Sequence, residues 1–251
     1  MKRIFVVLLF LAASTGATFA GEKTPQTILI VHGAWGGAWQ FSRIEPFLRA
    51  AGYDVRRVTL TGLGERAHLA TADIGLDTHI EDVLNVIRFE NLHDVILLGH
   101  SYGGMVITGV ADRMPERLRQ LIYLDAILPD NGESAADAIG PAAQKLLAAA
   151  AHGFIPAWWV KPGKPYPIDV PQPAKTFTDK LVLTHPDAAA IPSTYLLTIE
   201  EGKTAAEDEF FAFAQRAATR GWPVINMSGD HNPHWRQPEK TAAVILGAIA
   251  R

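Results

Sequence analysis

The chain has 251 residues, a formal net charge of −3 at pH 7 and no cysteine, and 48% of its residues are hydrophobic. This mildly acidic balance offers no electrostatic footprint for nucleic acid or an anionic membrane, so neither is expected as a partner. The lack of cysteine excludes disulfide scaffolds, thiol nucleophiles and cysteine metal sites, and a chain of this length can bury one α/β core.

The first twenty residues have the order of a secretory signal peptide. A short basic start precedes the unbroken apolar run 4–13, and the segment 14–20 is small and nearly uncharged. The apolar run is too short for a membrane span, which needs about 20 residues. We expect cleavage after Ala20, with Ala17 as the alternative, and a mature domain of residues 21–251 in the periplasm or outside the cell.

Short apolar runs alternate with helical patterns along the rest of the chain, which is typical of an α/β protein with a parallel sheet covered on both faces. Strands are predicted at residues 27–31, 53–58, 94–98, 120–124, 193–197 and 223–227. Helices are predicted at residues 38–51, from Thr78 onward, from Met105 onward, and at residues 203–220 and 238–251. Glu81 follows Thr78 at the spacing of a capping box, so Thr78 is expected to cap its helix.

The segment 128–192 interrupts this alternation. It shows no convincing strand, it carries five prolines between positions 162 and 173, and it includes Trp158 and Trp159. Because the segment is inserted between two core strands, we interpret it as a cap over the sheet and not as a linker. A cap at the strand ends would supply the apolar walls of a ligand pocket.

The sequence Gly99-His100-Ser101-Tyr102-Gly103 fits the pattern G-x-S-x-G of a serine nucleophile. A strand is predicted directly before it and a helix directly after it, which is the context that the pattern requires. Such a turn lifts the serine hydroxyl above the sheet, and the helix N-terminus favours negative charge in front of it. We therefore predict that Ser101 is a nucleophile, in preference to a chance strand–loop–helix turn.

A serine at its ordinary pKa is a poor nucleophile, so the chain should supply a base. Where the nucleophile stands in such a turn, the chain order is serine, acid and histidine, which places the base in a loop after the last strand. His231 and His234 both lie there, and we prefer His231 because it follows the strand–glycine turn most closely. His234 is expected to begin the next helix.

The acid that orients the base is expected between the nucleophile and the base, just past the strand at residues 193–197. Glu200 and Glu201 stand in that loop, and Glu201 is preferred. We expect its carboxylate to lie against the imidazole of the base, although paired loop glutamates are commonly solvated. Asp125, at the end of the preceding strand, is the alternative.

Acyl transfer also needs two donors aimed at the developing oxyanion. The first is expected to be the backbone N–H of Tyr102, directly after the nucleophile. The second is expected from the turn H-G-A-W-G-G at residues 32–37 and is assigned to the N–H of Ala34. A dinucleotide-binding loop is the competing interpretation, but the spacing G-x-G-x-x-G and an acidic residue closing the second strand are both absent.

Four motifs carry a resemblance to a known family: V-H-G-A-W-G-G-A-W, T-G-L-G-E-R-A-H-L, H-D-V-I-L-L-G-H-S-Y-G-G-M and Y-L-D-A-I-L-P-D-N-G. Together they resemble the α/β-hydrolase family of plant methylesterases, hydroxynitrile lyases and bacterial esterases, and most of all its pyrethroid-hydrolase-like carboxylesterases. The resemblance covers nearly the whole mature chain. It implies an α/β-hydrolase fold with His231 as catalytic histidine. The family's acid normally follows a tyrosine that matches Tyr195, and the matching position here is Glu201, where the family carries Asp.

Residues also distinguish the branches of this family. Hydroxynitrile lyases that resemble these esterases carry a lysine directly after the histidine and a threonine in the first oxyanion turn. This chain has Asn232 and Gly33 at those positions, so the lyase reaction is not favoured.

We therefore expect a serine hydrolase that cleaves small apolar or aromatic carboxylic esters, with Trp35, Trp158 and Trp159 as pocket walls. No cofactor is expected, and no metal site, since neither His-x-x-x-His nor paired carboxylate spacing occurs. Hydrolysis of lactones or amides and perhydrolysis on the same residues are alternatives, as is a non-catalytic binder on this fold. The sequence does not indicate an oligomeric state.

Overall fold

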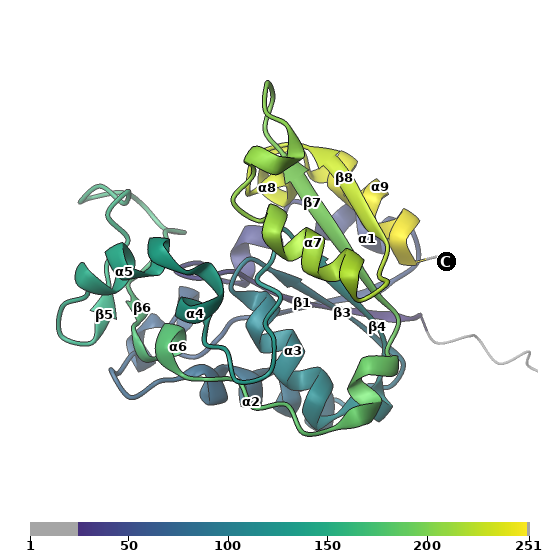
Figure 1. The fold of residues 1–251 in the computed structure, drawn as a ribbon, viewed down its shortest axis with the longest axis horizontal. Helices are drawn as coiled ribbons and strands as arrows, with labels where there is room; N and C mark the ends of the chain where they lie inside the picture. Colours follow the sequence, from purple (N-terminus) through teal and green to yellow (C-terminus); the bar gives the residue numbers. More distant parts are fainter. Residues whose placement is uncertain (1–24, 250–251) are drawn as a thin grey trace, which may run out of the picture.

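The computed structural model describes residues 25–249, so the predicted signal peptide at residues 1–20 lies outside the described residues. A six-stranded sheet in the order β2-β1-β3-β4-β7-β8 runs through the described part (Figure 1), and all neighbouring strands are parallel. Its strands are β1 (Thr27–Val31), β2 (Asp54–Val58), β3 (Val95–His100), β4 (Leu118–Leu124), β7 (Ser193–Ile199) and β8 (Val224–Ser228). The six predicted strands and the α/β fold are confirmed.

Helices cover both faces of the sheet, because the side chains of each strand alternate between two apolar clusters. Leu29 of β1 packs in the cluster that includes helices α2 (Leu76–Phe89), α3 (Gly103–Arg113) and α7 (Phe211–Thr219). Its neighbour Ile28 packs in the opposite cluster, with helices α1 (Glu45–Ala50) and α9 (Pro238–Ile249). Among residues 25–249, no helix has the length and apolar character needed to cross a membrane.

One predicted helix begins at a different residue from the observed one. The helix predicted from Thr78 begins at Leu76, and its N-cap Gly75 makes no side-chain hydrogen bond. A tertiary contact replaces the local cap, since the N–H of Leu76 donates to Asp179 at 3.1 Å. The prediction that Thr78 caps this helix is therefore wrong.

Other predicted helices are divided into shorter elements. The segment 38–51 forms a 3-10 turn, η1 (Ala38–Phe41), followed by α1, and the segment 203–220 forms η5 (Ala205–Glu207) followed by α7. A short helix, α8 (Pro233–Arg236), lies between β8 and α9, and two further 3-10 turns are η2 (Gly64–Leu69) and η3 (Pro115–Arg117).

The cap segment, residues 128–192, contains only short elements: α4 (Ala135–Ile139), α5 (Pro141–Ala148), β5 (Phe154–Ile155), β6 (Gln172–Pro173), α6 (Lys175–Thr178) and η4 (Pro186–Ala190). Most of them gather at one side of the sheet in Figure 1. The sequence predicts no strand in this segment. That prediction is wrong in one detail, because β5 and β6 form a small antiparallel pair of their own. This pair contacts the turn after β1, where the indole N–H of Trp35 donates to the carbonyl of Ile155 at 3.1 Å.

Candidate active site

Ser101 stands in a sharp turn between β3 and α3. Its φ angle is +54°, in the left-handed region that a serine rarely adopts. The turn is too tight for side chains on either side of it: a Cβ on Gly99 would lie 2.8 Å from the carbonyl oxygen of Gly103, and one on Gly103 would lie 2.7 Å from that of Val31. The G-x-S-x-G pattern is thus a steric requirement of this turn.

A chain of hydrogen bonds links Ser101 to a buried carboxylate through one imidazole. The hydroxyl of Ser101 lies 2.9 Å from Nε2 of His231, and Nδ1 of His231 lies 2.7 Å from Oδ2 of Asp125. Asp125 is 1% exposed, and its other carboxylate oxygen accepts the N–H of Thr198 at 3.0 Å. Since Nδ1–H donates to a carboxylate, Nε2 is left free to accept the proton of the serine hydroxyl.

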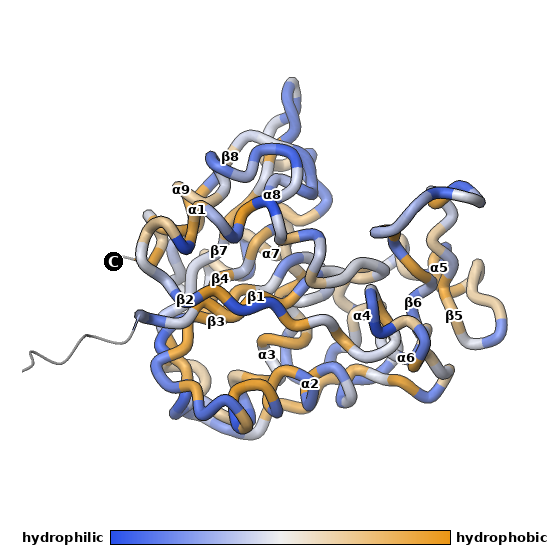
Figure 2. The backbone as a smooth tube through the Cα atoms, turned by 180° about the vertical axis from the view of Figure 1, so that it is seen from behind, coloured by the Kyte–Doolittle hydropathy of each residue, from blue (hydrophilic) through white to orange (hydrophobic). Residues whose placement is uncertain are grey.

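The prediction that Glu201 lies against the imidazole is wrong. Glu201 is exposed, and the carboxylate at Nδ1 of His231 belongs to Asp125. Glu200, the other glutamate of that loop, pairs with Lys203 at 2.6 Å. The loop after β7 is hydrophilic and projects from the body of the molecule (Figure 2), which is where charged side chains remain hydrated.

The order of the strands explains why Asp125 holds this position. β4 lies directly beside β3, with His100 paired to Leu124, so Ser101 and Asp125 are the first residues beyond two adjacent strand ends. The N–H of Asp125 donates to Leu196 of β7 at 2.8 Å, which fixes the backbone under the carboxylate. The sequence signal was an aspartate directly after a predicted strand, and Asp125 was the alternative acid for that reason.

Two residues that the sequence did not single out hold His231 in place. Nε2 of His100 donates to the backbone carbonyl of His231 at 2.7 Å, and the ring of Phe210 stacks on its imidazole at a centroid distance of 4.6 Å. The alternative base, His234, lies in α8 as predicted and is fully buried, stacked on Phe41 at 4.1 Å. Burial lowers the pKa of His234 to about 3.

The turn after β1 approaches Ser101 closely. A Cβ on Gly33 would lie 2.9 Å from Cβ of Ser101, so glycine lets the backbone reach the nucleophile. The N–H of Trp35 donates to Gln172 at 2.8 Å. Among residues 25–249, no acceptor is present for the N–H of Ala34 or of Tyr102. These two groups, one from the turn and one from the start of α3, are the donors that the sequence predicts for an oxyanion.

Buried neutral histidines surround these groups. Burial lowers the pKa of His32 to about 4, and burial together with the neighbouring histidines lowers the pKa of His100 well below its usual value. Burial, followed by the charge of Asp125, raises the pKa of Asp208. The buried histidines around the three linked residues are therefore neutral near pH 7.

The three tryptophans predicted as pocket walls lie together. The ring of Trp35 is 6.1 Å from that of Trp158 and 5.2 Å from that of Trp159, and it also lies 5.7 Å from Phe177. Trp158 and Trp159 remain 60% and 42% exposed. The cluster joins the cap segment to the turn after β1 and leaves part of the aromatic surface exposed.

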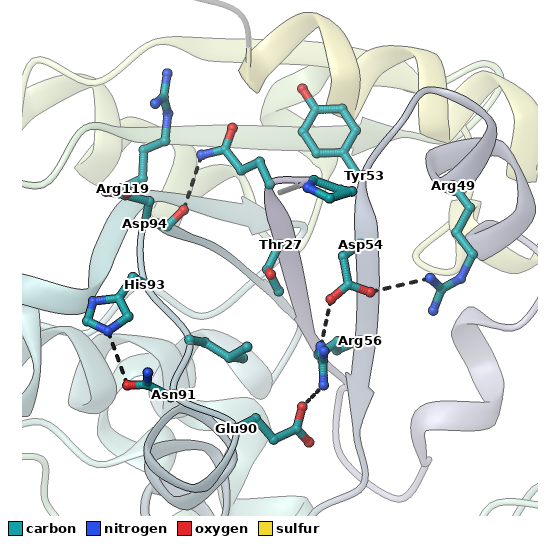
Figure 3. A pocket seen from close by; sticks show the side chains of 13 residues that line it. Thr27, Arg49, Tyr53, Asp54, Arg56, Glu90, Asn91, His93, Asp94 and Arg119 are labelled. Carbon is teal, nitrogen blue, oxygen red and sulfur yellow. Dashed lines mark hydrogen bonds and ion pairs between the residues drawn. The ribbon is translucent and has the colours of Figure 1, made fainter. Parts of the chain in front are cut away.

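A cavity of about 1000 Å³ lies elsewhere, at the amino-terminal ends of β1, β2, β3 and β4 (Figure 3). Its charged side chains pair with one another: Arg56 lies 2.8 Å from Asp54 and also contacts Glu90. It contains none of the three linked residues. Across residues 25–249, no group of three or more His, Cys, Asp or Glu side chains is arranged to hold a metal ion.

Comparison with known proteins places the chain among hydrolases. Residues 28–244 match the Alpha/beta hydrolase family. Over 106 residues, 42% of this chain and 44% of the relative, the sequence is 55% identical to the carbendazim hydrolyzing esterase of Nocardioides sp. (strain SG-4G). Over 112 residues, 43% of this chain and 39% of the relative, it is 35% identical to the pyrethroid hydrolase of Sphingobium wenxiniae. Each match thus covers less than half of the relative's length.

Solved structures show the same fold at lower sequence identity. An extracellular alpha/beta-hydrolase from a Paenibacillus species matches with a TM-score of 0.73 at 24% identity, covering 89% of this chain and 99% of that one. Tomato methylketone synthase I, in complex with 2-tridecanone, matches with a TM-score of 0.67 at 16% identity over 90% of this chain and 98% of that one. At these identities the likeness concerns the fold alone.

Proposed function

The chain belongs to the alpha/beta hydrolase family, and we propose that it is a serine hydrolase that cleaves carboxylic esters through an acyl-enzyme on Ser101. The observation that supports this most directly is the unbroken chain of hydrogen bonds from Ser101 through His231 to buried Asp125. Those three groups are the nucleophile, the base and the orienting acid that acyl transfer needs.

The reaction proceeds in two steps. Ser101 attacks the ester carbonyl while Nε2 of His231 takes its proton, and Asp125 stabilises the imidazolium that forms. The tetrahedral oxyanion rests on the N–H groups of Ala34 and Tyr102. His231 then protonates the departing alcohol, which leaves the acyl group on Ser101. A water molecule, deprotonated by His231, attacks the acyl-enzyme. The bond between the acyl carbon and the oxygen of Ser101 then breaks, His231 returns the proton to Ser101, and the carboxylic acid is released.

The substrate proposed is a small apolar or aromatic ester. Its support is the exposed aromatic surface of Trp158 and Trp159 beside Trp35, whose backbone belongs to the turn that approaches Ser101. Relatives named as a carbendazim hydrolyzing esterase, a pyrethroid hydrolase and a methylesterase agree with this class. We also propose that the protein is exported to the periplasm or the medium, because residues 1–20 read as a signal peptide.

The test is hydrolysis of p-nitrophenyl butyrate by the wild type and by Ser101→Ala. Turnover in the wild type and a loss of about 10³-fold or more in the variant are expected, since removal of the nucleophile leaves only binding and the oxyanion donors. Ser42→Ala, which changes an exposed serine, is the matched control and should keep full activity. Equal turnover by wild type and Ser101→Ala, or none by a folded wild type, would contradict the proposal.

A further inference from the structure

The cap segment holds the turn after β1 through Trp35. The φ angle of Trp35 is +61°, a conformation that a bulky residue adopts only when its surroundings enforce it. Its N–H donates to Oε1 of Gln172 at 2.8 Å, and its carbonyl accepts the N–H of Val170 at 2.8 Å. Its indole N–H donates to the carbonyl of Ile155 at 3.1 Å. Every polar group of this residue is thus bound by the cap segment.

Hydrogen bonds from the cap segment and from His32 fix two successive peptide planes of this turn. The Ala34–Trp35 peptide is held at both ends, since its N–H donates to Gln172 and its carbonyl accepts the N–H of Gly36 at 2.7 Å. The carbonyl of the preceding peptide, Gly33–Ala34, lies 2.6 Å from Nδ1 of His32. Nε2 of that ring accepts a backbone N–H at 3.1 Å, which leaves Nδ1 as the donor. Because a peptide unit is planar, these bonds set the direction of the Ala34 N–H.

Gln172 can hold its position because both ends of its amide are satisfied. It is fully buried, its Nε2 donates to the hydroxyl of Thr176 at 2.7 Å, and that hydroxyl donates to the carbonyl of Pro173 at 2.6 Å. The proton of the Thr176 hydroxyl is therefore used by Pro173. In a flipped amide, the NH₂ group would face the N–H of Trp35, and the amide oxygen would face the hydroxyl oxygen of Thr176. The amide oxygen is directed at the N–H of Trp35 by the structure around it.

We propose that Gln172 is a positioning residue of the oxyanion hole. It occupies the N–H of Trp35 and thereby keeps the adjacent N–H of Ala34 turned toward the oxyanion site. The cap segment then contributes to stabilising the transition state as well as to covering the substrate. This inference rests on the proposed esterase function.

The test compares Gln172→Leu, Gln172→Glu and Thr176→Val with the wild type. Gln172→Leu removes the acceptor, so kcat for p-nitrophenyl butyrate should fall about 10- to 100-fold while KM changes by less than about threefold, because the lost interaction belongs to the transition state. Gln172→Glu should restore most of kcat, since a protonated buried carboxyl has the same acceptor and donor arrangement as the amide. Thr176→Val keeps the acceptor and should retain kcat within about threefold.

Each other result overturns the inference. A raised KM with unchanged kcat in Gln172→Leu would mean that the cap segment only binds substrate. Equal losses of kcat in Gln172→Leu and Thr176→Val would mean general loosening of the cap, as would failure of Gln172→Glu to restore kcat in a folded protein. If the wild type shows Ser101-dependent turnover and Gln172→Leu matches it, the inference fails and the esterase proposal stands. A folded wild type without turnover contradicts the esterase proposal and the inference with it.

Discussion

The two edges of the parallel sheet differ in how their polar groups are used. At the amino-terminal edge, a cavity of about 1000 Å³ is lined by charged side chains that pair with one another in partly exposed positions (Figure 3). At the carboxyl-terminal edge, the carboxylate of Asp125 is buried, and its imidazole partner points at a serine hydroxyl. Cavity size therefore does not identify the reactive edge, whereas a buried charge aimed at a nucleophile does.

Backbone conformation separates the same two edges. Among residues other than glycine, the positive φ angles at the amino-terminal edge belong to Asn91 and Asp94, residue types that adopt this conformation readily. At the carboxyl-terminal edge they include Ser101 and Trp35, which adopt it only under constraint from the surrounding structure. Conformational strain is thus concentrated where the three linked residues lie, and the variants below test whether function is concentrated there too.

The largest expected effect is on catalysis and concerns the acid. Asp125→Asn should lower kcat by about 10³- to 10⁴-fold, because an amide at Nδ1 no longer stabilises the imidazolium or holds the required tautomer. Glu201→Gln, in the exposed loop after β7, should leave kcat within about twofold of the wild type. Steady-state kinetics on an ester substrate measures both. A large loss in Glu201→Gln with none in Asp125→Asn would reverse the assignment.

The next effect is on stability and contrasts one glycine from each edge. A Cβ on Gly103 would lie 2.7 Å from the carbonyl oxygen of Val31 and 2.8 Å from that of His32. Gly103→Ala should therefore lower the free energy of unfolding by about 2–3 kcal/mol. Gly52, at the start of β2, has a φ angle of +92° but open space around it, so Gly52→Ala should cost only about 1 kcal/mol. Urea denaturation measures both. Equal costs would contradict the steric argument.

The free energy of unfolding should also depend on pH because of a buried histidine, His234, at the carboxyl-terminal edge. The pKa of His234 is about 3 in the folded protein and about 6.5 in the unfolded chain, so the unfolded chain takes up the proton first as the pH falls. The stability contributed by neutral His234 is complete above about pH 6.5 and is lost progressively toward about pH 3. The free energy of unfolding should therefore fall between pH 7 and pH 4, by up to about 3 kcal/mol from this residue alone.

A variant of His234 locates this sensitivity. His234→Phe keeps the stacking on Phe41 and removes the titrating ring, so its free energy of unfolding should depend less on pH in that range. The wild type, measured in parallel, is the control. Urea denaturation at a series of pH values measures the slopes. An unchanged slope in His234→Phe would show that the buried ring does not titrate differently in the folded protein.

The smallest expected effect belongs to the ion pairs of the large cavity. Arg56→Ala removes the contacts of this arginine with Asp54 and Glu90, but all three side chains are partly exposed. Its cost to stability should stay below about 1 kcal/mol, because solvent and salt screen such pairs. Ester hydrolysis should be unchanged. A fall in kcat comparable to that of Asp125→Asn would show that the amino-terminal edge also takes part in the reaction.

Local patterns in the sequence predict the strands and the pairing of Ser101 with His231, because strand periodicity and the glycines around Ser101 are properties of short segments. They do not predict the acid. Glu201 follows one strand and Asp125 follows another, and the choice depends on which strand lies beside β3 in the folded sheet. The contact of Gln172 with Trp35 joins positions 137 residues apart, so nothing in the local sequence signals it.

The hydrogen bond from His100 to the carbonyl of His231 has a mechanical consequence. His100 precedes Ser101 directly, so the nucleophile and the backbone of the base are fastened to the same strand end. A fluctuation of α8 or α9 cannot carry the backbone of His231 away from Ser101 without breaking this hydrogen bond. Ser101 and the backbone of His231 are therefore coupled through His100, so we expect sequence changes in the C-terminal helices to change the distance between them little.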